Sequence, residues 1–75
     1  MPAAEILETN PDQKPMRILR LPEVTHRTGL PRGSVYEQIS LGLFPGPITL
    51  TVRTVGWVER EIEEWIIARI QARKR

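Results

Sequence analysis

Arginine supplies the positive charge in the middle of this 75-residue chain, and that segment holds the side chains best suited to chemistry. Residues 16–56 have five arginines and two glutamates, which makes their net charge +3, whereas residues 1–15 sum to −2 and residues 57–75 to +1. A planar guanidinium forms paired hydrogen bonds with phosphate oxygens and with guanine edges. The middle of the chain is therefore suited to a polyanionic partner. Its arginines are Arg17, Arg20, Arg27, Arg32 and Arg53.

One short segment combines an arginine with small and polar side chains at helical spacing. Arg32, Gly33 and Ser34 come first, and Glu37 and Gln38 follow one helical turn later. A helix that enters the DNA major groove reads bases with the exposed residues near its start. There an arginine can bind guanine or grip a phosphate, a glutamine can bridge adenine, a glutamate can accept from cytosine N4, and a glycine lets the backbone come close. This segment is the candidate for base contacts.

Five further positions could contact a nucleic-acid backbone. Arg53 and Thr54 lie near the expected tip of a hairpin, from which an arginine can enter the minor groove or lie along a row of phosphates. Arg27 and Thr28 lie at the end of an expected helix and are either backbone contacts or ordinary surface residues. Tyr36 either reaches a phosphate with its hydroxyl or packs its ring in the core. Arg17 and Arg20, by contrast, are expected to face water.

The residue types that metal binding and catalysis need do not occur in a suitable pattern. His26 is the single histidine and the chain has no cysteine, so a metal site fails on its number of ligands. Four glutamates between residues 59 and 64 suit the start of a helix, where the helix dipole favours negative charge. The sequence has no phosphate-cradling Gly-Lys-Ser/Thr run and no nucleophile elbow. We therefore expect no enzyme activity, no cofactor and no metal.

Glycine and proline divide the region around the candidate segment into short elements. Residues 16–21 nearly alternate apolar and charged side chains, which predicts a strand. A helix over residues 22–28 begins with a proline, whose missing N–H is no loss at a helix start, and ends at Gly29. A second helix over residues 32–41 carries the candidate segment and ends at Gly42. The residue before this second helix is a proline, which cannot supply a capping side chain.

An elbow, a hairpin and a long helix follow. Residues 44–47 contain two prolines and a glycine, which exclude a helix. Strand composition at residues 48–51 and 55–57 predicts a β-hairpin with Arg53 near its tip. Residues 59–72 have acids early, cations late and apolar side chains at three- and four-residue spacing, which predicts an amphipathic helix. The apolar stripe of that helix consists of Val58, Ile62, Trp65, Ile66 and Ile70.

Size and composition favour one small domain. A chain of 75 residues buries only about three fifths of its unfolded surface, too little to enclose a deep catalytic cleft. Residues 1–15 contain three prolines and no aromatic residue, so we expect a flexible leader there and a single domain over residues 16–75. The lack of cysteine favours a reducing compartment, and no segment approaches the roughly 20 apolar residues of a membrane span. We expect a cytoplasmic, nucleoid-associated chain with no membrane partner.

Short motifs follow one another in a characteristic order. They are Ile18-Leu19-Arg20-Leu21, Glu23-Val24, Thr28-Gly29-Leu30, Ser34-Val35-Tyr36, Phe44-Pro45 with Pro47, Val55-Gly56-Trp57, and Glu61-Ile62 with Trp65. In this order they resemble the AlpA-like phage regulators, which are akin to excisionases and to the DNA-binding half of MerR-type regulators. The resemblance implies an α+β, mainly α fold: a small winged helix-turn-helix with three helices and a β-hairpin wing.

The resemblance also implies a function. A protein of this kind is a sequence-specific transcriptional regulator that binds double-stranded DNA, with the helix over residues 32–41 in the major groove and the wing on the backbone or in the minor groove. A single winged module buries only ~600–1,000 Å² on DNA. We therefore also expect self-association or cooperative binding at repeated sites.

Two other functions fit the sequence. An excisionase-like architectural factor would bend DNA for the excision of a prophage or mobile element, with a recombinase or another regulator as its partner. Gel shifts with circularly permuted probes would separate it from a regulator, which need not bend its site. A protein-interaction adaptor or inhibitor would instead use Trp65, Ile67 and the leader, and would retain a cellular protein without binding any duplex.

Overall fold

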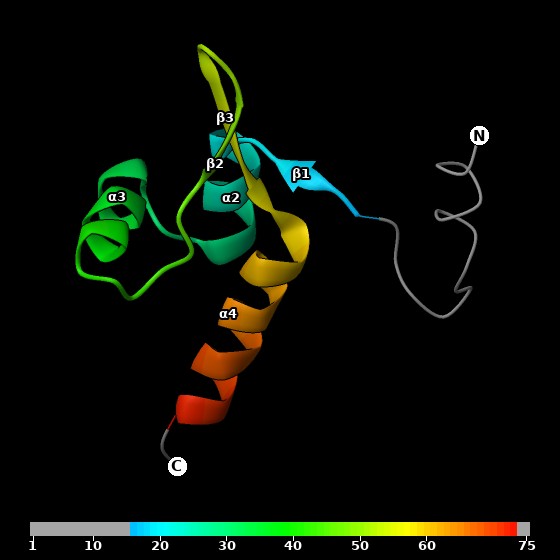
Figure 1. Ribbon diagram of the computed structural model, residues 1–75. Coiled ribbons are helices and arrows are strands. Elements are labelled where there is room, and N and C mark those ends of the chain that lie inside the picture. Colours follow the sequence, from blue (N-terminus) through cyan, green and yellow to red (C-terminus); the bar gives the residue numbers. More distant parts are fainter. Residues whose placement is uncertain (1–15, 74–75) are drawn as a thin grey trace.

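Three helices and a small sheet form the described part of the chain, residues 16–73, in the computed structural model (Figure 1). The helices are α2 (Leu21–Thr28), α3 (Arg32–Ser40) and α4 (Glu59–Ala72), and the strands are β1 (Ile18–Leu19), β2 (Ile48–Thr51) and β3 (Thr54–Val58). The predicted α+β, mainly α, winged helix-turn-helix fold is confirmed. The expected leader, residues 1–15, lies outside the described residues.

The sheet joins the start of the described chain to the hairpin. Its strand order is β1-β3-β2, and both pairings are antiparallel. Leu19 of β1 lies opposite Trp57 of β3, while Ile48 of β2 lies opposite Gly56 on the other side of β3. The sequence predicted the hairpin correctly. It did not predict that the short first strand would pair with β3, because that contact spans the whole helix-turn-helix.

The hydrophobic core draws side chains from almost every element. Its buried members are Leu19, Val24, Val35, Phe44, Trp57 and Ile62. Trp57 has no exposed surface, and its Nε1 donates a hydrogen bond of 3.0 Å to the carbonyl oxygen of Pro45. A buried indole N–H needs such an acceptor. The bond therefore fixes the elbow against the base of the hairpin.

Two glycines end the first two helices, as predicted. Gly29 has φ +77° and its N–H donates to the Thr25 carbonyl, while Gly42 has φ +75°. After α3, Gly42 N–H donates to the carbonyl of Ile39 and the next residue donates to that of Gln38, the hydrogen-bond pair of a Schellman motif. This left-handed conformation strains other residue types, so glycine is required at both ends.

The last helix departs from its prediction at one position. Its bounds match the predicted range of residues 59–72, and Ile62 is fully buried. The prediction that Ile70 belongs to the buried stripe is wrong, because that side chain is 54% exposed. Figure 1 gives the reason: the C-terminal half of α4 extends beyond the other elements. No helix within residues 16–73 is long and apolar enough to cross a membrane.

The crossing point of β1 and β3 leaves no room for a side chain at Gly56. A Cβ atom there would meet the Cγ2 atom of Ile18, and would lie 3.1 Å from the carbonyl oxygen of Leu19 and 3.2 Å from Cδ1 of Leu50. We expect Gly56→Ala to lower the free energy of unfolding by about 1–3 kcal/mol, because overpacking forces the strands apart. Urea denaturation measures this loss.

Gly46 provides the matched control for that substitution. It is an exposed glycine in the elbow, and a Cβ atom added there meets nothing within 4 Å. Gly46→Ala should change stability by no more than about 0.5 kcal/mol. Equal losses in the two variants would show that the close approach at Gly56 is not the cause.

Candidate nucleic-acid interface

A tight turn sets the angle between α2 and α3. The hydroxyl of Thr28 donates to the Val24 carbonyl at 2.8 Å and accepts from the Leu30 N–H at 3.2 Å. Gly29 reverses the chain between these two bonds, and Leu30 packs against the core. Thr28, one of the predicted site residues, thus holds the turn with its hydroxyl.

One face of α3 is anchored and another is open. Val35 is fully buried and Ile39 packs against the core, which fixes the orientation of the helix. Three predicted site residues, Arg32, Gly33 and Glu37, are exposed. The structure therefore presents these three members of the candidate segment on the solvent side of a helix that the core holds in place.

Two other predicted residues of α3 lie toward α4. Ser34 and Gln38 are half-buried and line a shallow depression with Glu37. Trp65 and Arg69 of α4 form part of the same depression. Ser34 and Gln38 thus lie to one side of the candidate interface.

The start of α3 has the features of an anion-attracting helix end. Its N-cap residue is Pro31, no side chain caps it, and its first turn contains no acidic residue. The first N–H groups of a helix have no intrahelical partners and carry partial positive charge. A Cβ atom added at Gly33, in the first turn, would meet nothing within 4 Å. The expectation that this helix lacks a side-chain cap is confirmed.

The ring of Tyr36 packs against the core, and the residue is also partly open to solvent. Its ring lies against Trp57 in an edge-on arrangement, with ring centroids 6.4 Å apart, yet the residue remains 43% exposed. One side of the ring thus supports the core. The open part leaves the side chain accessible on the same helix as Arg32.

The hairpin carries the second group of candidates. Figure 1 shows it projecting beyond the helices. Val52 and Arg53 form the turn between β2 and β3, both are exposed, and the Arg53 N–H contacts the Thr51 hydroxyl at 3.4 Å. Thr54 is half-buried and pairs with Thr51 in the ladder. The predicted position of Arg53 near the tip is confirmed.

A network of ion pairs joins β1, α2 and α4. Arg27 lies 2.8 Å from Glu59 and 3.6 Å from Glu63, and Arg17 lies 3.6 Å from Glu59 and 3.0 Å from Glu23. Glu59 is only 8% exposed. Arg17 is exposed, as expected, but the sequence did not predict that it also pairs with carboxylates of two helices. No local spacing signals this network, because its partners are far apart in the sequence.

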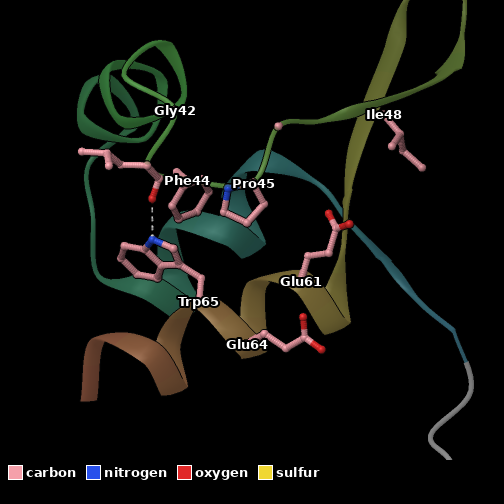
Figure 2. A pocket seen from close by; sticks show the side chains of 9 residues that line it. Gly42, Phe44, Pro45, Ile48, Glu61, Glu64 and Trp65 are labelled. Carbon is pink, nitrogen blue, oxygen red and sulfur yellow. Dashed lines mark hydrogen bonds between the residues drawn. The ribbon is translucent and has the colours of Figure 1, made fainter. Parts of the chain in front are cut away.

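A second surface depression lies between the elbow and α4 (Figure 2). Trp65 Nε1 donates a hydrogen bond of 2.9 Å to the carbonyl oxygen of Leu43, and the Trp65 ring meets Phe44 edge-on with centroids 4.8 Å apart. Glu61 and Glu64 line the same depression from α4. None of the predicted site residues lies here. The contacts instead fix the chain that leads from α3 to the hairpin.

The described residues offer no metal centre. Across residues 16–73, no group of three or more histidine, cysteine, aspartate or glutamate side chains is placed to hold a metal ion. His26 is exposed on α2 beside Pro22 and Glu23, in line with a surface role.

Comparison with known proteins identifies the family. Residues 17–70 match the family model of the prophage CP4-57 regulatory protein AlpA. The chain belongs to the AlpA family. An AlpA-family chain was predicted from the order of short motifs, and that prediction is confirmed. The matched residues include the whole helix-turn-helix and the hairpin.

Two relatives resemble this AlpA-family chain over most of its length. The uncharacterized protein ORF88 of Enterobacteria phage P4 is 43% identical over 65 residues, which cover 87% of this chain and 74% of the relative. The DNA-binding transcriptional activator AlpA of Escherichia coli K12 is 40% identical over 60 residues, which cover 72% of this chain and 86% of the relative.

The ion-pair network yields a stability prediction. We expect Arg27→Ala to lower the free energy of unfolding by roughly 1–2 kcal/mol, because it leaves the mostly buried Glu59 carboxylate with only the longer contact to Arg17. As a control, Arg60→Ala removes an exposed arginine from α4, the helix that carries Glu59, and should change stability by less than about 0.5 kcal/mol. Thermal or urea unfolding measures both, and equal effects would contradict the role of the network.

Proposed function

We propose that this chain is a sequence-specific transcriptional regulator that binds double-stranded DNA and has no enzymatic activity. The observation that carries the proposal is the open face of α3, which follows a tight turn and is held by the core residue Val35. A relative at 40% identity is described as a DNA-binding transcriptional activator, which supports the same class of function.

In the proposed complex, α3 lies in the major groove. The groove is wide enough to admit an α-helix, and its base edges carry a distinct pattern for each base pair. Arg32 binds guanine or a phosphate at the start of the helix, and Gly33 lets the backbone approach closely. Glu37 meets a base edge one turn later and accepts from cytosine. Gln38 reaches adenine, and Ser34 a nearby base edge or phosphate, from the side of α3 that faces α4.

The hairpin contacts DNA beside the groove that α3 occupies. Arg53 lies along the phosphates or enters the minor groove, and Thr54 supports it at the edge of the hairpin. The projection of the hairpin and the exposure of Arg53 support this role. The sheet positions the wing, because β3 is held between β1 and β2.

Residues at the end of α2 act mainly through position. The Thr28 hydroxyl forms both of its hydrogen bonds within the turn, and the Arg27 guanidinium forms ion pairs with two glutamates. Thr28 therefore contributes to DNA binding by holding α2 and α3 in register, and Arg27 by holding α2 against α4. Phosphate contact is a secondary role of both residues. Tyr36 reaches a phosphate with its exposed hydroxyl while its ring stays on Trp57.

The partners beyond DNA remain predictions. Cooperative binding at repeated sites fits the small area that one winged module covers. The excisionase-like alternative, with a recombinase as partner, differs in that it requires bending of the site, which circularly permuted probes detect. Cytoplasmic location is likewise expected of a protein that binds the chromosome or a prophage.

Two arginine substitutions test the proposal. Against a duplex selected from a random library, Arg32→Ala and Arg53→Ala should each cost about 1–3 kcal/mol of binding free energy without unfolding the protein. If three to five phosphates are neutralised, log affinity should fall against log salt with a slope of roughly −3 to −4.5. A variant that loses one phosphate contact should reduce that slope by about 1. Titrations at several salt concentrations measure both quantities.

Arg60→Ala is the charge-matched control, because it removes the same charge from an exposed position on α4. It should leave the affinity nearly unchanged. Unchanged affinity in both the Arg32 and Arg53 variants at low salt would overturn the proposal.

Gly33→Ala separates binding from folding. Outside its own helix, a methyl group there has no atom of residues 16–73 within 4 Å, and it improves helix propensity, so stability should rise by roughly 0.5–1 kcal/mol. The same methyl group stands between the helix backbone and the groove, so DNA affinity should fall. Opposite changes in unfolding free energy and in affinity are the expected result. Affinity that stays the same or rises would show that the backbone does not approach DNA at this position.

A further inference from the structure

The C-terminal half of α4 carries an exposed apolar patch. Ile67 and Ile70 are 52% and 54% exposed, and Ile66 is half-buried beside them. Ile70 comes three residues after Ile67 and four after Ile66, and residues at these two separations are neighbours on a helix surface. Ile70 therefore joins the other two isoleucines into a continuous surface. We call this surface the isoleucine patch.

The isoleucine patch begins where α2 stops covering α4. One helical turn earlier, Glu63 contacts Arg27 of α2, and Glu59 does so one turn before that. Beyond this point α4 extends past the other elements (Figure 1). Three neighbouring isoleucines on such a helix are a surface that another molecule can cover.

The charge along α4 favours a second copy of the same helix as that molecule. Its first half carries four glutamates, at positions 59, 61, 63 and 64. Its end is basic, with Arg69 in the last turn and Arg73, Lys74 and Arg75 next in the sequence. An antiparallel copy of the helix sets the basic end of each beside the acidic half of the other, and opposes the two helix dipoles favourably.

We propose that the isoleucine patch binds the same patch of a second copy, with the two α4 helices antiparallel. The two-fold axis then passes between Ile67 and Ile70, so that each of these residues faces the other type across the interface. Glu63 and Glu64 of each helix then lie opposite the basic end of the partner helix.

The size of the patch determines when this pairing matters. Three isoleucines make an interface well below the ~1,200 Å² of a stable complex, so pairing in dilute solution is weak. When two copies bind adjacent DNA sites, the effective concentration of one relative to the other is on the order of millimolar. At that concentration even a weak interface forms. This last step rests on the proposed DNA binding, whereas the pairing itself does not.

Cysteine crosslinking tests the pairing without DNA, because the chain has no cysteine of its own. Ile67→Cys places a thiol close to the proposed axis, and Ala68→Cys places a thiol at another exposed position, on a different side of the same helix. Under mild oxidation at high protein concentration, the full chain with Ile67→Cys should form a disulfide-linked dimer at least tenfold faster than the chain with Ala68→Cys. The difference should shrink at high salt, which screens the charges.

Equal rates in the two variants, or a faster rate at position 68, would overturn the pairing.

A second measurement compares binding to DNA that carries one or two copies of a selected site. The unsubstituted chain should bind the second site at least several-fold more tightly, and Ile67→Ser with Ile70→Ser should abolish that gain while leaving single-site affinity unchanged. A gain that persists in the double variant would overturn the role of the patch on DNA. Failure to bind even one site would overturn the proposed function alone, and the crosslinking rates would still decide the pairing.

Discussion

Burial of Trp57 is the constraint on which the arrangement of the other elements depends. Its ring has no exposed surface, its backbone pairs with Leu19 of β1, and its indole N–H bonds to the Pro45 carbonyl of the elbow. Tyr36 of α3 packs edge-on against the same ring. The strand β1, the elbow and the candidate recognition helix α3 therefore all contact this one residue. In a domain this small, a few shared contacts must fix each element in place.

Local signals were enough to predict most of the fold. The helix over residues 59–72 was predicted at both ends, because its charges and its apolar spacing lie within the helix itself. Gly29 and Gly42 marked helix ends because only glycine adopts the left-handed conformation without strain. The pairing of β1 with β3 and the contact of Arg27 with Glu59 could not be predicted, since each joins residues more than 30 positions apart.

The candidate site was predictable in its location and less so in its detail. The turn glycine and the polar segment after it were sufficient to place Arg32 and Glu37 on an open helix face. Sequence spacing alone could not show that Ser34 and Gln38 line a depression beside α4, because that depends on the position of α4 relative to α3. The choice between two roles for Tyr36 likewise needed the position of the Trp57 ring.

The cations of the chain divide into two groups with different tasks. Arg17 and Arg27 are committed to carboxylates, one of them mostly buried, so moving either onto a phosphate would leave a glutamate uncompensated. Arg32 and Arg53 are exposed, and within residues 16–73 neither pairs with a carboxylate. The net charge of +3 in the middle segment therefore overstates what the scaffold can offer to DNA. In the proposed complex, specific binding then depends on a few contacts made by α3 and the hairpin, and the proposed pairing with a second copy adds most where contacts are so few.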